Sequence, residues 1–98
     1  MTTNGVGDKA TRAERIRAAL ASLQPIALDL VDESHRHIGH EGARDGRGHY
    51  ALRIVSTAFT GKSMLARHRL VYAALDALMR TDIHALSVEA LAPGDAGG

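Results

Sequence analysis

The apolar residues of this chain follow two spacings, one typical of helices and the other of strands. Intervals of three and four predict amphipathic helices, whereas alternation predicts strands with one buried face. In chain order, the predicted elements are a helix over residues 11–23, strands over 26–32 and 49–56, a helical stretch over 64–80 and a strand over 84–91. This order predicts a two-layer α+β domain.

Local signals mark where the two helical stretches begin and end. Thr11 and Glu14 match a capping box at the start of the first helix, and Pro25 ends it. Ser63 is a suitable N-cap for the second stretch, which we expect to be either one helix or a short helix that bends near residues 68–70 into a longer one. Its predicted buried face consists of Leu65, Val71, Ala74, Leu75, Leu78 and Met79.

Both ends of the chain and one internal segment lack these patterns. Residues 1–10 are polar and contain glycine, and residues 92–98 contain a proline and three glycines. We therefore expect two disordered tails around a domain of residues 11–91. Residues 33–48 contain four glycines. A hairpin needs far fewer residues, so we expect a long, mobile loop between the first two strands.

Composition excludes several classes of function. The 98 residues are 45% hydrophobic and 3% aromatic, which predicts one domain with a mostly aliphatic core. Twelve basic and eleven acidic residues give a net charge of +1, which favours neither nucleic acid nor a membrane. The lack of cysteine excludes disulfides, a thiol nucleophile and an all-thiolate iron–sulfur site from this chain alone. Without a long apolar stretch or a signal-peptide core, we expect a cytoplasmic protein.

Histidine is the most prominent candidate chemistry, with six copies in the chain. His35, His37, His40 and His49 lie in or beside the long loop, and His84 opens the last predicted strand. Neutral imidazole is a common metal ligand, so the His-x-His pattern of His35 and His37 with His40 nearby suits a metal. A solvated polar loop explains the same pattern, and His84 by itself also matches a strand-edge histidine that binds nothing.

A local group of basic residues contrasts with the balanced net charge. Lys62, Arg67, His68 and Arg69 occur without an acidic residue over positions 60–69. A helix that carries such residues suits contacts to DNA phosphates, although a solvated helical face has the same composition. The chain has no complete phosphate-binding loop, dinucleotide fingerprint or serine-hydrolase motif, so nothing in the sequence predicts an enzyme.

Three segments together resemble the BolA family. They are residues 32–40 (DESHRHIGH) followed by 48–50 (GHY), residues 59–63 (FTGKS) leading to 67–72 (RHRLVY), and residues 83–87 (IHALS). The resemblance extends from about residue 12 to residue 93. It implies a fold similar to a class II KH domain, in the order α-β-β-α-α-β, with a three-stranded sheet packed against the helices.

The resemblance implies partnership with a monothiol glutaredoxin and its glutathione, in which a [2Fe–2S] cluster bridges the two proteins. The histidine that the family places in the last strand matches His84, and the family's loop ligand matches His37 by position. His35, His40 and His49 are the less favoured alternatives for that second ligand. Iron ligation by histidine is chemically sound because Rieske centres use it, and the partner would supply the thiolates.

The resemblance also implies a second role, in DNA binding and transcriptional regulation. A KH fold normally clamps nucleic acid with a Gly-x-x-Gly loop, but the corresponding turn here has only Gly61, followed by Lys62 and Ser63. Contacts from Lys62, Arg67 and Arg69 to the backbone of duplex DNA are therefore the alternative function. A third candidate class of function is a histidine-rich metal-binding module that binds zinc or nickel only in vitro.

Overall fold

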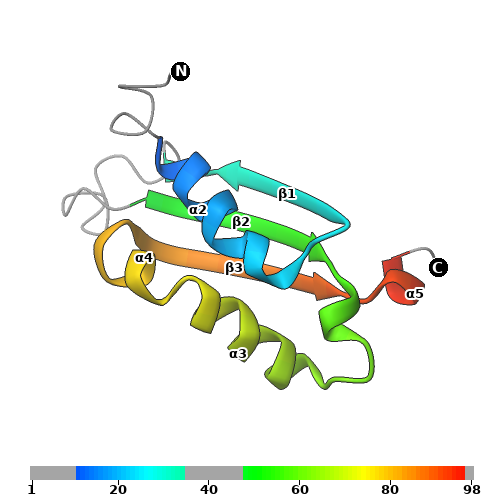
Figure 1. Ribbon diagram of the computed structural model, residues 1–98. Coiled ribbons are helices and arrows are strands. Elements are labelled where there is room, and N and C mark those ends of the chain that lie inside the picture. Colours follow the sequence, from blue (N-terminus) through cyan, green and yellow to red (C-terminus); the bar gives the residue numbers. More distant parts are fainter. Residues whose placement is uncertain (1–10, 35–47, 97–98) are drawn as a thin grey trace, which may run out of the picture.

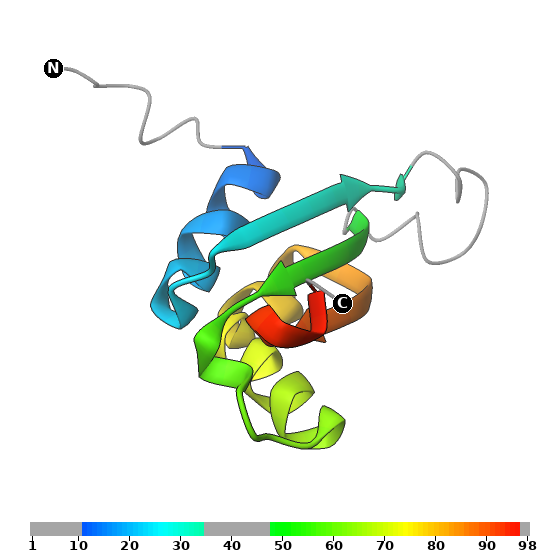
Figure 2. The same ribbon diagram turned by 90° about the vertical axis from the view of Figure 1, so that its right-hand side faces the viewer.

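A computed structural model describes residues 11–34 and 48–96 of the chain. Three strands form one mixed sheet, namely β1 (Ala27–Asp32), β2 (Gly48–Val55) and β3 (Ile83–Leu91). β2 is central and pairs antiparallel with β1 and parallel with β3 (Figures 1 and 2). The residues predicted to form the N-terminal tail (1–10) and most of those predicted to form the mobile loop (35–47) lie outside the described part of the chain.

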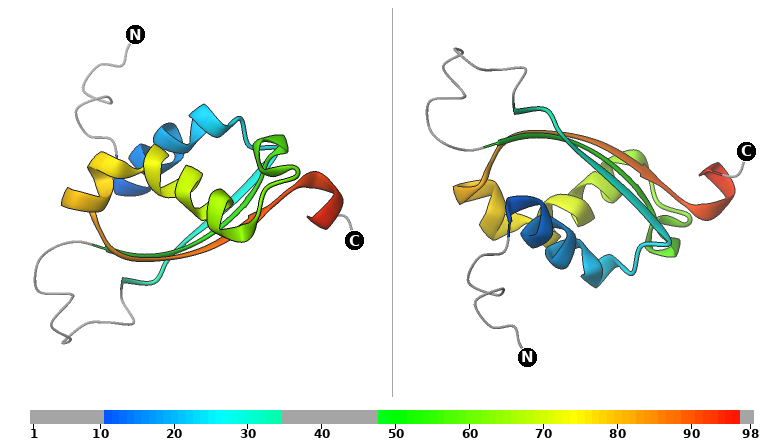
Figure 3. Two further views of the ribbon diagram at one scale, coloured as in Figure 1. Left: turned by 90° about the horizontal axis from the view of Figure 1, so that it is seen from below. Right: turned by 90° about the horizontal axis from the view of Figure 1, so that it is seen from above.

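The helices lie mainly on one face of the sheet. They are α2 (Arg12–Leu20), α3 (Met64–Ala74), α4 (Asp76–Thr81) and α5 (Pro93–Ala96), with short 3-10 turns η1 (Ala21–Leu23) and η4 (Thr57–Phe59). Figure 3 shows α2, α3 and α4 together on one side of the sheet, while α5 follows the end of β3. The predicted order α-β-β-α-α-β and the three-stranded sheet are confirmed. Among residues 11–34 and 48–96, every helix is too short or too polar to span a membrane.

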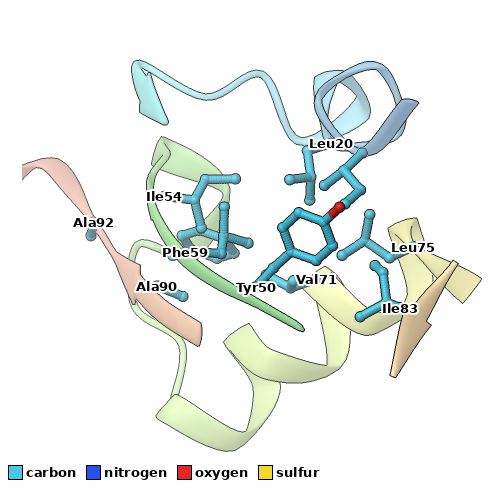
Figure 4. Packing of buried hydrophobic residues seen from close by; sticks show 11 residues of the cluster. Leu20, Tyr50, Ile54, Phe59, Val71, Leu75, Ile83, Ala90 and Ala92 are labelled. Atoms are coloured by element: carbon cyan, nitrogen blue, oxygen red, sulfur yellow. The ribbon is translucent and has the colours of Figure 1, made fainter. Parts of the chain in front are cut away.

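The core fills the space between this helical layer and the sheet (Figure 4). Its buried members are Ile16, Leu20, Tyr50, Leu52, Ile54, Phe59, Val71, Leu75, Ile83, Ala90 and Ala92. Most are aliphatic, as predicted, but the largest fully buried side chain is Phe59. Burying a side chain of this size stabilises the fold by about 1.5–3 kcal/mol relative to leaving it exposed.

Both predicted helix caps are present. The Thr11 hydroxyl accepts the Glu14 N–H at 3.1 Å, and the Glu14 carboxylate accepts the Thr11 N–H at 2.9 Å, which completes the capping box of α2. The Ser63 hydroxyl accepts the Ala66 N–H at 3.1 Å at the start of α3. Each such cap contributes about 1 kcal/mol to the stability of its helix.

The second helical stretch bends at a different place from the predicted one. The break between α3 and α4 lies at Leu75 (φ −98°, ψ 9°) and not near residues 68–70, which form part of continuous α3. Leu75 is fully buried, and turning the helix axis there keeps both α3 and α4 in contact with β3. Local apolar spacing does not reveal this bend because it depends on the sheet beneath the helices.

One predicted core position and the first residue of a predicted strand are exposed. Leu65 is 60% exposed because it lies in the first turn of α3, ahead of the part of the helix that supplies Val71 and Leu75 to the core. Ile26 is 64% exposed and precedes β1, which begins at Ala27. Alternation and helical spacing identified the faces of these elements, but not how far each face extends over the core.

The end of the described chain is more ordered than predicted. Residues from 92 onward were predicted to be a disordered tail, yet Ala92 is buried and Pro93–Ala96 form α5. The Asp95 carboxylate accepts the Ala92 N–H at 3.2 Å and a hydrogen bond from Arg67 at 2.7 Å. These contacts with a distant part of the chain hold a segment that local composition predicts to be disordered.

Candidate histidine site at one end of the sheet

His49 and His84 lie against each other where β2 and β3 begin. The centroids of their rings are 5.1 Å apart, and the ring planes are tilted by 45°. Because β2 and β3 are parallel, residues near the start of each strand lie at the same end of the sheet (Figure 1). The fold thus brings together two histidines that are far apart in the sequence.

A register irregularity places His84 at this point. Gly48 pairs with Ile83 and His49 pairs with Ala85, so His84 lies between two paired residues of β3 without a direct partner in β2. This is the arrangement of a β-bulge, which redirects a side chain at the cost of regular pairing. Ile83 is fully buried, whereas His84 and the following Ala85 are both exposed. The bulge therefore directs His84 away from the core.

The two rings differ in burial. His49 is only 8% exposed, whereas His84 is exposed to solvent. Imidazole nitrogens ligate iron, and two histidines on one iron occur in Rieske [2Fe–2S] centres. The pair therefore presents one accessible imidazole, that of His84, against a second imidazole that is almost fully buried. Within the described residues, no group of three or more histidine, cysteine or carboxylate side chains could hold a metal ion.

The backbone of His49 is fixed by the segment that ends β1. The Ser34 hydroxyl accepts the His49 N–H at 3.0 Å, and the His49 carbonyl accepts the Glu33 N–H at 2.7 Å. The Ser34 N–H in turn bonds the Asp32 carboxylate at 2.9 Å. The Asp-Glu-Ser sequence of residues 32–34 therefore holds the start of β2 in place.

Gly48 occupies a position with no room for a side chain. A Cβ atom there would lie 2.6 Å from the Tyr50 ring and 3.0 Å from both the Arg12 guanidinium and the Ser34 hydroxyl. The Tyr50 ring is itself buried, and this burial raises the pKa of its hydroxyl although a hydrogen bond from Arg12 acts in the opposite direction. A glycine directly before His49 is thus required by close packing.

Asp82 connects the start of β3 to α2. Its carboxylate accepts hydrogen bonds from Arg12 at 3.4 Å, from Thr81 at 2.6 Å and from Arg15. The hydrogen bond from Thr81, followed by that from Arg15, lowers the pKa of Asp82 below its usual value. The Asp82 carbonyl also accepts the Gly48 N–H at 2.8 Å. Sequence reasoning missed this cluster because its members are distant in the chain.

The structure places only part of the predicted metal site. It brings His84 to His49, which the sequence ranked among the less favoured second ligands. His37, the favoured second ligand, lies outside the described residues together with His35 and His40. The signal for His49 was its place at the start of a strand, but the parallel partner of that strand was not identifiable from the sequence.

The predicted DNA-binding residues have different environments. Arg67 has a side chain only 11% exposed, and it donates hydrogen bonds to the carbonyls of Lys62 and Ala90 and to Asp95. Lys62 and Arg69 are exposed, and neither makes an ion pair with another residue of the described chain. The structure thus separates a buried structural arginine from two accessible cations, Lys62 just before α3 and Arg69 in the middle of it.

Comparison with known proteins gives consistent matches. The family model for BolA-like proteins matches residues 20–95. The chain is 43% identical over 91 residues to SufE-like protein 1, chloroplastic/mitochondrial, of Arabidopsis thaliana, which covers 87% of this chain and 24% of that protein. It is 41% identical over 76 residues to the DNA-binding transcriptional regulator BolA of Escherichia coli (strain K12), with coverage of 76% and 70%.

The solved structures agree in fold. The BolA domain of SufE1 from Arabidopsis thaliana superimposes with a TM-score of 0.74 at 42% identity, and the match covers 87% of this chain and 95% of that domain. The chain therefore spans about a quarter of SufE-like protein 1, and the matched part is its BolA domain.

Proposed function

Since this chain belongs to the BolA family, we propose that it is a non-enzymatic adaptor that shares a [2Fe–2S] cluster with a monothiol glutaredoxin. The observation that carries the proposal is the contact between His49 and His84, whose ring centroids lie 5.1 Å apart. Two imidazoles meet at the end of the sheet in a chain that has no cysteine. The thiolates of the cluster would come from the partner and its glutathione.

The proposal assigns His84 as one iron ligand and leaves two candidates for a second histidine ligand. His84 is exposed and stands on a bulge, so its ring is accessible to a partner. His49 is supported by its contact with His84, and His37 by its position in the family motif. Imidazole must be neutral to bind iron, so acidification releases the cluster by protonating the ligands.

The visible absorption and circular dichroism spectra of the mixed complex test this assignment. His84→Ala is expected to abolish the wild-type spectrum or shorten the cluster lifetime by at least about tenfold, because it removes the exposed imidazole of the pair and leaves only the buried one. His49→Ala and His37→Ala then identify the second ligand by which of them reproduces this loss. His68→Ala is the matched control, since His68 lies on α3 and outside the pair. A His84→Ala complex with the wild-type spectrum and lifetime would show that the assignment is wrong.

DNA binding is the second candidate function. Its support is the name of the Escherichia coli relative, a DNA-binding transcriptional regulator, together with the exposed Lys62 just before α3 and the exposed Arg69 within it. Replacing both by alanine is expected to weaken duplex binding regardless of sequence and to reduce the slope of log affinity against log salt by about 1 per lost phosphate contact. An unchanged slope in the double variant would exclude this surface. Arg67 is left out of the test because its guanidinium is held within the fold.

A further inference from the structure

The side chain of Arg12 contacts β2, which carries His49, and Asp82, the residue directly before β3, which carries His84. Its Nε lies 3.4 Å from the Asp82 carboxylate, two residues before His84. It also donates a hydrogen bond to the hydroxyl of Tyr50, and its guanidinium lies 3.0 Å from where a Cβ of Gly48 would be. Arg12 of α2 thus contacts Gly48 and Tyr50, which flank His49, and Asp82, which leads into the bulge.

We propose that Arg12 is a positioning residue that sets the geometry of the His49–His84 pair. The effect on a cluster rests on the function proposed above, whereas the effect on the two rings does not depend on it. Arg12 precedes residues 20–95, the part of the chain that the family model matches. The role of Arg12 follows from its contacts in this chain and not from the family match.

The bulge explains why the pair needs such a residue. In a regular parallel ladder, backbone hydrogen bonds to the neighbouring strand fix the position of each residue and so the direction of its side chain. A bulge interrupts these bonds at the extra residue. Here the interruption falls between Gly48 and His49, opposite His84. The Gly48 N–H bonds the Asp82 carbonyl at 2.8 Å immediately before it, so the position of Asp82 sets where the irregular part of β3 begins.

Guanidinium geometry suits this role better than a simple positive charge. The planar guanidinium of arginine presents several donors in fixed directions, so one side chain can bond the Asp82 carboxylate and the Tyr50 hydroxyl together. Lysine keeps the charge but not this fork. The Arg12 side chain is 32% exposed, and ion pairs with a partly exposed member contribute little to folding stability. A variant of Arg12 is therefore expected to fold while its histidines are displaced.

The first arm of the experiment uses the metal-free full chain. Arg12→Gln is expected to remove the cross-ring nuclear Overhauser effects between His49 and His84 and to shift their imidazole ¹⁵N resonances, while Arg12→Lys has an intermediate effect. Arg17→Gln is the matched control, because Arg17 is exposed on the same helix and makes no ion pair with another described residue. Thermal unfolding of each variant checks that the fold is retained.

The second arm uses the mixed complex with glutaredoxin. Removal of groups that orient a metal ligand typically costs 10–100-fold in metal affinity, so Arg12→Gln is expected to shorten the cluster lifetime by about tenfold relative to Arg17→Gln. If His84→Ala leaves the cluster unchanged while Arg12→Gln still displaces the rings, the proposed function fails and the positioning role stands. If the cross-ring contacts in Arg12→Gln equal those in Arg17→Gln, the positioning role is overturned.

Tyr50→Phe keeps the proposal testable if Arg12→Gln does not fold. This change removes the hydroxyl that Arg12 bonds and preserves the buried ring. Displaced histidine resonances in Tyr50→Phe support the proposal. Histidine resonances and cross-ring contacts identical to those of the wild type in this variant would contradict it.

Discussion

Arg67 on α3 donates a hydrogen bond of 2.7 Å to the carboxylate of Asp95 on α5. The same guanidinium donates to the carbonyls of Ala90 at 3.1 Å and Lys62 at 2.9 Å. One side chain thus joins the start of the long helix, the end of β3 and the last helix. In the sequence Arg67 suggests a contact to DNA phosphate, but in the structure its guanidinium is used in hydrogen bonds within the protein.

Arg67→Ala is expected to destabilise the protein by about 1–3 kcal/mol, because it leaves the Ala90 carbonyl without this donor and releases α5. Arg69→Ala is the control, since Arg69 is an exposed neighbour on the same helix, and its expected effect is below about 0.5 kcal/mol. Urea unfolding followed by circular dichroism measures both. Equal midpoints for the two variants would contradict the structural role of Arg67.

Gly48→Ala is expected to cost about 1–3 kcal/mol through overpacking, because the added methyl group would lie 2.6 Å from the Tyr50 ring. The same change should displace the His49 resonances, since His49 follows directly in β2. Gly94→Ala is the comparison, because a Cβ at that position meets no atom within 4 Å beyond its chain neighbours and the backbone of its own helix. A Gly48→Ala protein as stable as Gly94→Ala would show that Tyr50 and Arg12 move aside easily.

Ser56 is a fully buried polar residue that joins the end of β2 to the 3-10 turn η1. Its hydroxyl donates to the Leu23 carbonyl at 2.5 Å and accepts the Ala58 N–H at 3.0 Å. Ser56→Ala leaves both backbone groups without this partner and is expected to cost about 1–3 kcal/mol. Ser22→Ala removes a hydroxyl that bonds the Ala19 carbonyl at 3.2 Å on the surface, so calorimetry should show a much smaller loss there.

Stability is expected to fall in acid partly through Asp82. Hydrogen bonds from Thr81 and Arg15 lower the pKa of this carboxyl in the folded state. A group with a lowered folded pKa stabilises the protein above its unfolded pKa, and this contribution is lost as the pH falls below about 4 through the folded value. Melting temperatures between pH 7 and pH 3 should therefore fall less for Asp82→Asn than for the wild type. Parallel pH profiles would exclude this contribution.

Sequence patterns predicted the elements of this fold well because those patterns are local. The Thr11–Glu14 capping box and the Ser63 cap mark the starts of α2 and α3 as expected, and alternation identified the buried face of β2. The α-β-β-α-α-β order follows from these elements together with the resemblance. Each signal depends on residues within a few positions of one another, so no tertiary information was needed.

The missed features all depend on contacts between distant segments. The bend at Leu75 follows from packing on β3, and the order of α5 follows from Arg67. The contact between His49 and His84 requires both the parallel pairing of their strands and a bulge, neither of which changes the local sequence pattern. For this reason the sequence did not predict that His49 lies against His84.

The parallel pairing of β2 with β3 also has a consequence for folding. His49 and His84 are separated by α3 and α4, so they cannot meet until this crossover has formed and β3 has added to the sheet. Forming such non-local contacts requires a large loss of chain entropy before any contact compensates it. Contact between the two imidazoles is therefore a marker of completed folding, and a partly folded chain would present its histidines as separate, weak donors to any metal in its surroundings.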